Sequence, residues 1–398
     1  MDSKTPALTA VLLAMTMALA PLAIDAYLPA FPTMATGLDT TLANISLTIA
    51  VYVLLLALGQ LIGGPMADRW GRKVVMLSGL AIFGLASLGI SLSHSFEMLL
   101  LLRGLQAFGG GWAAVCVPAL VRDRFFGNQA ARFISTIGLI MIIAPAVAPN
   151  IGTLILSVSD WRTIFLFLSG YAAVLLALLW LGLFSKPSHS PHKTVHQSIW
   201  QGYATVLSTR RAMPYLLLQS LSFAVMLIFI AHSAFIYQSH FGASPQLFSL
   251  LFSANIGLML VMNLINRALL NHFPSPTILR WGLTVQGIGI TCLLLVSLLY
   301  PTLALFLPAM VLTIGSMGAI TPNSQACYMD FFAKHGGTAA ALLGASQFAI
   351  GAAITGFSSW LPQSLLTIVL SQAACSIACL VIAWRPSQRN QTIPTEQH

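Results

Sequence analysis

The chain has 398 residues, of which 57% are hydrophobic and only 7% are charged, whereas a soluble domain carries about 25% charged residues. No soluble fold of this length has an interior large enough to hide so much apolar surface. The composition therefore excludes a soluble enzyme and indicates a protein that lies within a lipid bilayer.

Apolar runs of about 20 residues, the length of a helix that crosses a bilayer, recur along the chain. They lack the strict alternation of a membrane β-barrel, so helices are favoured. We expect an all-α membrane protein of twelve transmembrane helices, with spans near residues 8–30, 43–65, 74–92, 97–119, 132–156, 163–184, 213–238, 246–268, 278–299, 302–323, 338–359 and 363–384.

A net charge of +9 could suggest a nucleic-acid partner, so the placement of the basic residues matters. When the N-terminus is put in the cytoplasm, every Lys and Arg except Arg103 and Arg162 falls in a cytoplasmic segment or beside one. This bias is the one that the positive-inside rule describes. It predicts that both termini are cytoplasmic, and it explains the charge without a nucleic acid.

The first span contains Asp25, the only carboxylate well inside a predicted helix, and the fourth contains Arg103, its only basic counterpart. A charge at the centre of a membrane helix costs roughly 2.5–3.5 kcal/mol, so each needs a reason. Counted at 1.5 Å per residue, both lie in the outer half of the bilayer at similar depth. They can form a fixed ion pair that only orders the two helices, or Asp25 can be a site of proton uptake and release.

Two further segments of the first half are rich in small residues and proline. Between the second and third spans, residues 63–73 read Gly-Gly-Pro-Met-Ala-Asp-Arg-Trp-Gly-Arg-Lys. Small residues there let the two helix ends approach, and the basic residues anchor a cytoplasmic face. The fifth span holds Gly138, Pro145, Pro149 and Gly152, which would bend the helix and allow close packing against a neighbour.

The longest polar break in the chain, residues 185–212, divides it into halves of six spans each, residues 1–184 and 213–398. Such a layout is typical of transporters whose halves rock about a central site. Within the break, one apolar helical face predicts a short interfacial helix on the cytoplasmic leaflet. That face contains Ile199, Trp200, Tyr203, Val206 and Leu207.

Polar residues near mid-membrane are the candidates for substrate contact, although hydrogen bonds between helices would explain any one of them equally well. These candidates are Tyr27, Tyr52, Gln106, His232, Tyr237, Asn255 and Gln347. His232 lies about 207 residues after Asp25, at roughly the corresponding place in the second half, either as a packing residue or as a second titrating group. Phe223, Phe229 and Phe235 are possible walls of an apolar cavity that suits a moderately hydrophobic ligand.

The segment at 63–73 resembles the signature between the second and third helices of the major facilitator superfamily. Arg103 with Gln106 and Gly109–Gly111 is similar to the motif of its fourth helix, and the Gly/Pro pattern of the fifth span resembles its antiporter motif. The match extends to the Bcr/CflA-type drug/proton antiporters. It rests on Asp25-Ala26-Tyr27-Leu28-Pro29-Ala30-Phe31-Pro32, Val121-Arg122-Asp123, Phe235-Ile236-Tyr237-Gln238 and Gly344-Ala345-Ser346-Gln347-Phe348.

The resemblance implies a proton-driven exporter of small amphipathic compounds in the bacterial inner membrane, with Asp25 and Arg103 in proton coupling. A single carboxylate favours neutral or cationic cargo, although Arg103 leaves anions possible. It also implies a cytoplasmic gate that would be closed when the cavity faces outward. The residues of that gate are Gly64, Asp68, Arg69, Gly71, Arg72, Arg122 and Asp123.

We expect a monomer whose partners are its substrate, protons and the lipid bilayer, with no cofactor and no metal. No nucleophile–base pair, phosphate loop or His/Cys ligand set stands in or beside the spans, which argues against an enzyme. Two alternatives stay open. One is a dedicated exporter of an endogenous metabolite or siderophore, and the other is a membrane sensor or scaffold that binds ligand without moving it.

Overall fold

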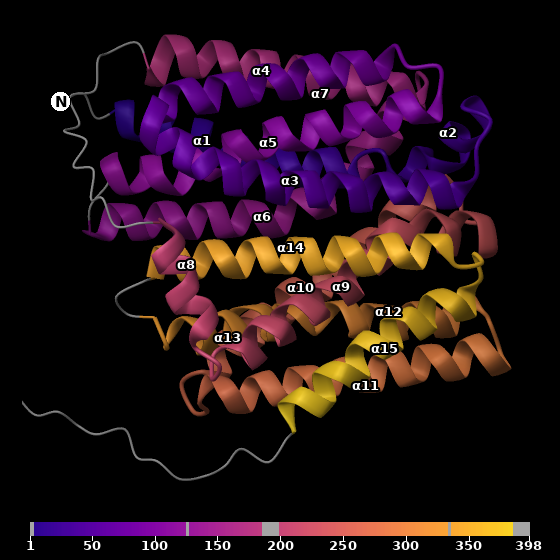
Figure 1. Cartoon of the computed structure of the whole chain (residues 1–398). Coiled ribbons are helices and arrows are strands. Elements are labelled where there is room, and N and C mark those ends of the chain that lie inside the picture. Colours follow the sequence, from indigo (N-terminus) through magenta and orange to yellow (C-terminus); the bar gives the residue numbers. More distant parts are fainter. Residues whose placement is uncertain (1–3, 125–126, 185–198, 333–335, 385–398) are drawn as a thin grey trace, which may run out of the picture.

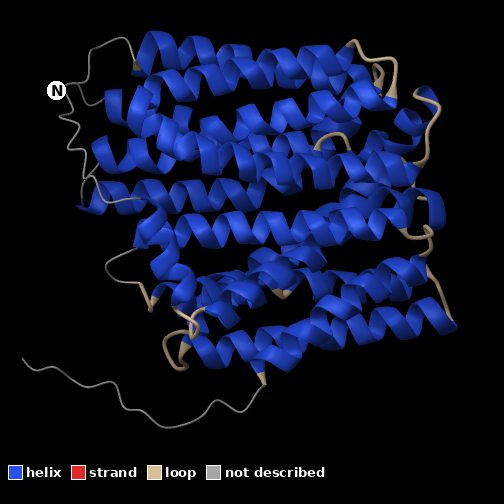
Figure 2. Ribbon diagram, viewed as in Figure 1, coloured by secondary structure: helices blue, strands red, loops and turns tan. Residues whose placement is uncertain are grey.

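The computed structural model describes residues 4–124, 127–184, 199–332 and 336–384. Their regular secondary structure is entirely helical (Figure 2). Before the linker the helices are α1 (Lys4–Asp25), η1 (Leu28–Ala30), α2 (Phe31–Gly37), α3 (Leu42–Trp70), α4 (Arg72–Ser91), α5 (Phe96–Arg124), α6 (Gly127–Leu156), α7 (Trp161–Leu178) and η2 (Leu179–Leu183). After it they are α8 (Ile199–Ser208), α9 (Met213–Ala234), η3 (Phe235–His240), α10 (Pro245–Leu269), α11 (Ser275–Leu299), α12 (Leu303–Gly315), α13 (Met317–Met329), α14 (Gly336–Trp360) and α15 (Leu365–Ala383).

These helices confirm the all-α membrane fold. Within the described residues, 11 helical segments are long and apolar enough to cross a membrane. The twelfth span is α6, a 30-residue helix whose described apolar part is Ile143–Leu156. Most span ends fall within a few residues of the prediction, while the first and the tenth run further, to Gly37 and Met329.

Short polar side chains and glycine set several helix boundaries. Thr41 and Ser244 accept hydrogen bonds from backbone N–H groups in the first turns of α3 and α10, and Asp160 does the same for α7. Such caps satisfy donors that have no partner inside the helix. Between α3 and α4, Gly71 has φ +88°, a conformation that glycine adopts without strain.

The first span is not the single helix predicted for residues 8–30, because α1 ends at Asp25. Pro29 stands four residues later and has no N–H to donate to the Asp25 carbonyl, and Pro32 has the same effect on Leu28. A turn, η1 and α2 therefore follow. Asp25 lies at a helix end instead of inside a helix, and Tyr27 is fully buried just beyond it.

In Figure 1 the long helices run roughly side by side, with α1–α7 in indigo to magenta on one side and α9–α15 in rose through orange to yellow on the other. The two groups meet where α3 packs against α14 and α6 against α10. We call the end of the bundle that carries α8 the linker end, and the end that carries α2 the far end (Figure 1).

The predicted linker coincides only partly with the described residues, since 185–198 lie outside them. The expected short helix is present as α8. Its Val206 is fully buried and packs in a cluster with Leu216, Tyr328 and Phe332 of the second group. This part of the apolar face therefore contacts protein, and the placement of α8 on the leaflet stays a prediction, as do the boundaries of the two halves.

Close backbone approaches hold α5 between α3 and α4. A Cβ at Gly59 would clash with the carbonyl of Phe108. A Cβ at Gly79 or at Gly109 would lie 2.6 Å from the carbonyl oxygen of the other. Small residues at helix contacts are the usual means of close packing in membranes, and here they fix the helix that carries Arg103.

Candidate functional site

Arg103 of α5 is completely buried at the centre of the first group of helices. Its guanidinium carbon lies 4.3 Å from the ring centroid of Tyr27, 4.3 Å from that of Tyr52 and 5.7 Å from that of Phe165. A desolvated cation over an aromatic face gains about 2 kcal/mol or more. The structure therefore brings two predicted substrate residues, Tyr27 and Tyr52, against the predicted coupling arginine.

A chain of hydrogen bonds fixes one edge of the guanidinium. Arg103 Nη1 donates to Gln106 Oε1 at 2.6 Å, one turn further along α5. Gln106 Nε2 donates in turn to Ser87 Oγ of α4 at 2.7 Å, and that hydroxyl donates to the carbonyl of Phe83. Arg103 Nε and Nη2 are buried and have no hydrogen-bond partner among the described residues.

Asp25 is also buried, and its Oδ1 has no hydrogen-bond partner in the described part of the chain. Within that part the ion pair between side chains is the one that joins Asp160 and Arg162 at 3.9 Å. The fixed pair of Asp25 with Arg103 is therefore absent from this conformation. The contact to Arg103 comes instead from Tyr27, whose hydroxyl is hydrogen-bonded to Thr48 Oγ1 at 2.7 Å.

Helix α6 packs closely against the backbone that follows Asp25. A Cβ at Gly152 would overlap the carbonyl oxygen of Ala26, the residue after Asp25. Pro145 and Pro149 are buried in the same helix, while Gly138 lies outside the described side chains. The close packing predicted for the fifth span is thus present at Gly152, which packs against the end of α1 in the first span.

The same helix meets the second group through hydroxyl hydrogen bonds near the far end. Thr153 Oγ1 is hydrogen-bonded to Ser249 Oγ of α10 at 2.7 Å. Ser249 Oγ also lies 3.1 Å from the carbonyl of Pro149, and Ser253 Oγ donates to the carbonyl of Ala146 at 3.0 Å. Asn150 Nδ2 donates to Ser253 Oγ at 3.1 Å. In the described residues these contacts join the two groups of helices by hydrogen bonds.

The other predicted substrate residues form separate pairs in the second group. His232 Nε2 is hydrogen-bonded to Ser358 Oγ of α14 at 3.0 Å. Asn255 Nδ2 donates to the Tyr237 hydroxyl at 3.3 Å. A third pair joins Gln219 Nε2 to Gln347 Oε1 at 2.8 Å. Among the described residues, no hydrogen bond connects these pairs to the Arg103 cluster, so the candidates do not form one continuous site in this conformation.

Aromatic rings pack on one another in the second group, and some of them contact Tyr237. Phe229 stacks on Phe252 with ring centroids 5.5 Å apart, and it meets Tyr237 edge-on. Phe223 of α9 packs on Phe348 of α14 at 5.5 Å. The second group thus presents a largely apolar, aromatic interior, and the role of these rings as cavity walls stays a prediction.

The loop between α3 and α4 ties the linker end of the first group together. Arg72 Nη1 donates to the carbonyl of Ala119 at 2.6 Å, and Lys73 Nζ donates to the carbonyl of Phe184 at 3.1 Å. Arg72 thereby binds a carbonyl near the C-terminal end of α5, and Lys73 binds one just after the C-terminal end of η2. The C-terminal end of a helix carries the negative end of the helix dipole, which favours cations there. Asp68 and Arg69 are exposed.

Of the other predicted gate residues, Gly64 faces Val115 at 3.8 Å from where a Cβ would stand. Arg122 and Asp123 belong to α5, but their side chains lie outside the described part of the structure.

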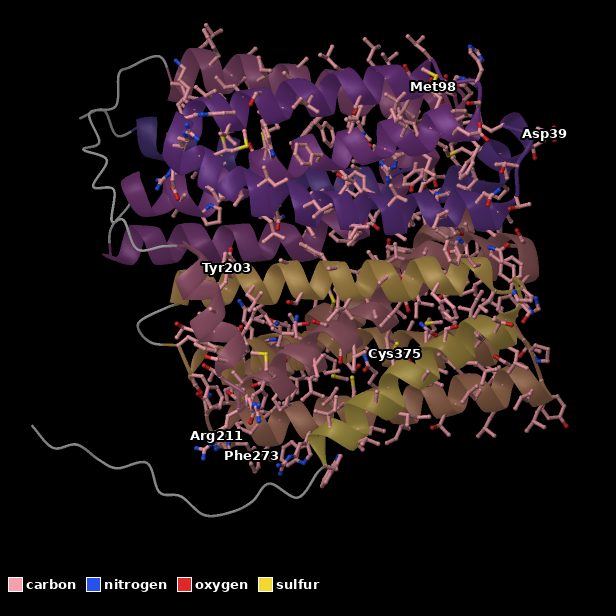
Figure 3. The ribbon with its side chains drawn as sticks, in the orientation of Figure 1. Asp39, Met98, Tyr203, Arg211, Phe273 and Cys375 are labelled. Carbon is pink, nitrogen blue, oxygen red and sulfur yellow. The ribbon has the colours of Figure 1, made fainter. Side chains whose placement is uncertain are left out.

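Figure 3 shows the two ends of the bundle through labelled residues, with Asp39 at the far end and Tyr203 and Arg211 at the linker end.

Several residues of the site are not distinguished by the sequence. Phe165, Ser87 and Thr48 complete the surroundings of Arg103, and Ser358 is the partner of His232. Each is an ordinary apolar or hydroxyl residue of a membrane span. Only the packing of segments far apart in the chain gives them their place.

Comparison with known proteins settles the family. The sequence description of the Major Facilitator Superfamily matches residues 13–356, which is most of the chain. The chain belongs to the major facilitator superfamily. A structure of the xylose transporter XylE from E. coli superimposes with a TM-score of 0.75 at 13% identity, over 98% of this chain and all of that one, which shows the shared fold.

Its relatives within the superfamily support the finer resemblance. The chain is 31% identical to the uncharacterized MFS-type transporter YdgK of Bacillus subtilis, over 87% of both proteins. It is 27% identical to a bicyclomycin resistance protein homolog of Haemophilus influenzae, over 94% of both. It is 30% identical to a chloramphenicol resistance protein of Pseudomonas aeruginosa, over 87% of this chain and 82% of that protein.

These relatives confirm the resemblance to the Bcr/CflA-type branch of the superfamily. This member of the superfamily is accordingly a multi-pass membrane transporter and not an enzyme. The comparisons do not reach individual residues, so the roles of Asp25, Arg103 and the gate residues stay predictions.

Proposed function

We propose that this transporter exports small amphipathic compounds across the bacterial inner membrane, driven by protons that move inward. It acts as a monomer without a cofactor, and the linker end, with both termini, faces the cytoplasm. Support comes from relatives named for resistance to bicyclomycin and chloramphenicol. The clustering of basic residues in predicted cytoplasmic segments supports the orientation.

The observation that carries the proposal is the carboxyl group of Asp25, buried with an unpartnered oxygen where α1 ends. An ionised carboxylate without a partner is far more costly to bury than a protonated one. Asp25 therefore suits a site that holds a proton in this closed surrounding and releases it when another conformation admits water or a counter-charge. Arg103 is a buried cation of the same group of helices.

Alternating access requires that the halves close at one end while they open at the other. In this conformation the hydroxyl contacts of α6 with α10 join the halves near the far end. At the linker end Asp68 and Arg69 are exposed. We propose that these two residues take part in a gate at the linker end only when the far end opens.

Inverted membrane vesicles with an acidified interior test the proposal. Chloramphenicol and bicyclomycin serve as probes, and the internal pH is followed after each addition. We expect proton efflux in response to a transported probe. In Asp25→Asn this response should be reduced by about tenfold or more, because asparagine cannot take up or release a proton. A tenfold reduction corresponds to about 1.4 kcal/mol.

Asp39→Asn is the matched control. Asp39 is exposed at the far end with φ 47°, and asparagine tolerates that left-handed conformation. The substitution Asp39→Asn removes one negative charge, as Asp25→Asn does, but it lies outside the buried site. The proton response of this variant should therefore equal that of the wild type. Equal responses from Asp25→Asn and the wild type would contradict the role of Asp25 in coupling.

The same assay separates the alternatives. A response to one endogenous metabolite or siderophore, and to no drug, would favour a dedicated exporter. Binding of a probe without any movement of protons or probe would favour a sensor or scaffold that does not translocate its ligand.

A further inference from the structure

The guanidinium of Arg103 is restrained by two aromatic rings and by a hydrogen bond at one nitrogen, while its Nε and Nη2 edge has no partner among the described residues. Tyr27 and Tyr52 each place a ring 4.3 Å from its central carbon, and Gln106 accepts from Nη1. The remaining donors, Nε and Nη2, are buried and unpartnered among the described residues. The group is therefore held in one orientation that presents a single edge.

That edge has a specific chemical preference. Nε and Nη2 direct two parallel N–H bonds, the arrangement that binds the two oxygens of a carboxylate side by side. The hydroxyl of Tyr52, whose ring covers the guanidinium, is another buried donor without a partner in the described residues. Each of these unpartnered groups can therefore donate a hydrogen bond, Nε and Nη2 as obligatory donors and the hydroxyl as donor or acceptor, which matches a ligand that offers acceptor oxygens.

Among the described side chains, none forms an ion pair with this edge of Arg103. Arginine remains charged in proteins, and a charge buried without a counter-ion is costly even when aromatic rings offset part of that cost. Asp25 does not form an ion pair with Arg103 in the described structure, where the ion pair is that of Asp160 with Arg162.

The position of the cluster connects it to the transport path. The helix α3, which carries Tyr52, packs against α14 of the second group, and η1, which follows Tyr27, contacts α9 and α10. Within α9, α10 and α14 the only Asp, Glu, Lys or Arg is Arg267, in the last turn of α10 at the linker end. These second-group helices supply no carboxylate for Arg103 and offer mainly apolar surface.

We propose that Arg103 recognises an oxyanion on the transported compound, and that amphipathic carboxylates are a substrate class of this transporter. This inference rests on the proposed export function and names the chemistry of its site. The carboxylate binds Nε and Nη2 side by side, while the apolar part of the molecule contacts the aromatic residues. Binding replaces an unpartnered buried cation with a paired one, whereas a neutral amide offers one acceptor oxygen and no negative charge to compensate the cation.

The test uses the purified full chain in detergent and two probes of nearly equal shape, 1-naphthoate and 1-naphthamide, with binding measured by calorimetry. We expect the wild type to bind the carboxylate more tightly than the amide by about tenfold or more, because a site built for a charged hydrogen bond discriminates strongly against an analogue that cannot make it. Equal affinities, tighter binding of the amide, or no binding of the carboxylate would overturn the inference without any variant.

Arg103→Lys keeps the charge but removes the two parallel N–H donors, so the preference for the carboxylate over the amide should fall to about threefold or less. Arg162→Lys makes the same exchange at the far-end arginine that pairs with Asp160, and it should retain the full preference. Retention of the full preference in Arg103→Lys would overturn the assignment to Arg103.

Asp25→Asn separates this inference from the proposed function. We expect it to keep the preference for the carboxylate while the proton response of vesicles is lost. A lost preference with an intact proton response would refute the anion site and leave proton-coupled export standing. A retained preference together with an intact proton response would refute the coupling role of Asp25 and leave the anion site standing.

Discussion

Two tyrosines contact the same buried guanidinium, but their hydroxyl groups have different surroundings. The Tyr27 hydroxyl is hydrogen-bonded to Thr48 at 2.7 Å, whereas the Tyr52 hydroxyl is buried with no partner among the described residues. Both rings lie 4.3 Å from the guanidinium carbon of Arg103. The aromatic contact and the hydrogen bond can therefore be separated by removing one oxygen atom.

We expect Tyr27→Phe to lower the free energy of unfolding by about 1 kcal/mol, because it removes a satisfied buried hydrogen bond. Tyr52→Phe should change it by about 0 kcal/mol or raise it slightly, since it removes a buried polar atom that lacks a partner. Unfolding of the detergent-solubilised protein, followed by circular dichroism, measures both. A larger loss for Tyr52→Phe than for Tyr27→Phe would contradict this account of the cluster.

At the scale of the element, α6 makes the tightest backbone approach among the described glycines, at Gly152. Gly152 touches the Ala26 carbonyl at the break that follows Asp25, while Thr153 contacts Ser249 of the second group. Two successive residues of one helix thus face the first span and the opposite half. A shift of α6 would alter the surroundings of Asp25 and the contact between the halves together.

Gly152→Ala should be severely disruptive, because the added methyl would overlap a backbone oxygen that no rotamer change can move. We expect a loss of about 1–3 kcal/mol in stability together with loss of transport. Gly170→Ala in α7 is the matched control, since nothing lies within 4 Å of its added Cβ. Melting temperature and vesicle transport report both variants, and normal transport by Gly152→Ala would refute the close approach.

At the scale of the whole molecule, the halves are joined near the far end by neutral hydrogen bonds, in which hydroxyl groups take part, and not by ion pairs within the described residues. Hydrogen bonds between membrane helices contribute about 0.6 kcal/mol each on average. Hydrogen bonds of this strength can favour one conformation and still allow the change between outward and inward access that transport requires.

Loss of two of these hydroxyl groups should therefore shift the population toward opening at the far end. We expect Thr153→Val with Ser249→Ala to increase the open fraction several-fold, because about 1.2 kcal/mol is removed if each contact has the average strength. Spin labels at the exposed Ser157 and Gln246 would report longer distances, with the five native cysteines replaced.

The control for that experiment is Thr16→Val with Ser220→Ala, which removes hydroxyl groups that bind carbonyls of their own helices. It should leave the distance distribution unchanged. An identical distribution for the Thr153/Ser249 variant and the wild type would show that these hydroxyl groups do not hold the far end closed.

The sequence by itself determined the solvent and the helices, since each span must satisfy its own backbone inside a bilayer and must be apolar over about 20 residues. Arg103 and Asp25 stand out for the same reason, because isolated charges in such spans are costly. The break at Asp25 was also within reach of sequence reasoning, through the proline four residues later.

Only the tertiary structure decided which side chains meet. Tyr27 and not Asp25 contacts Arg103, and the hydrogen bonds of Gln106 and His232 to other helices are made with Ser87 and Ser358. These contacts depend on the rotation and depth of helices that are distant in the chain. The hydropathy of a span does not determine its rotation or its depth relative to another helix. Both are determined by close approaches between helices, such as those at the glycines of α5 and α6.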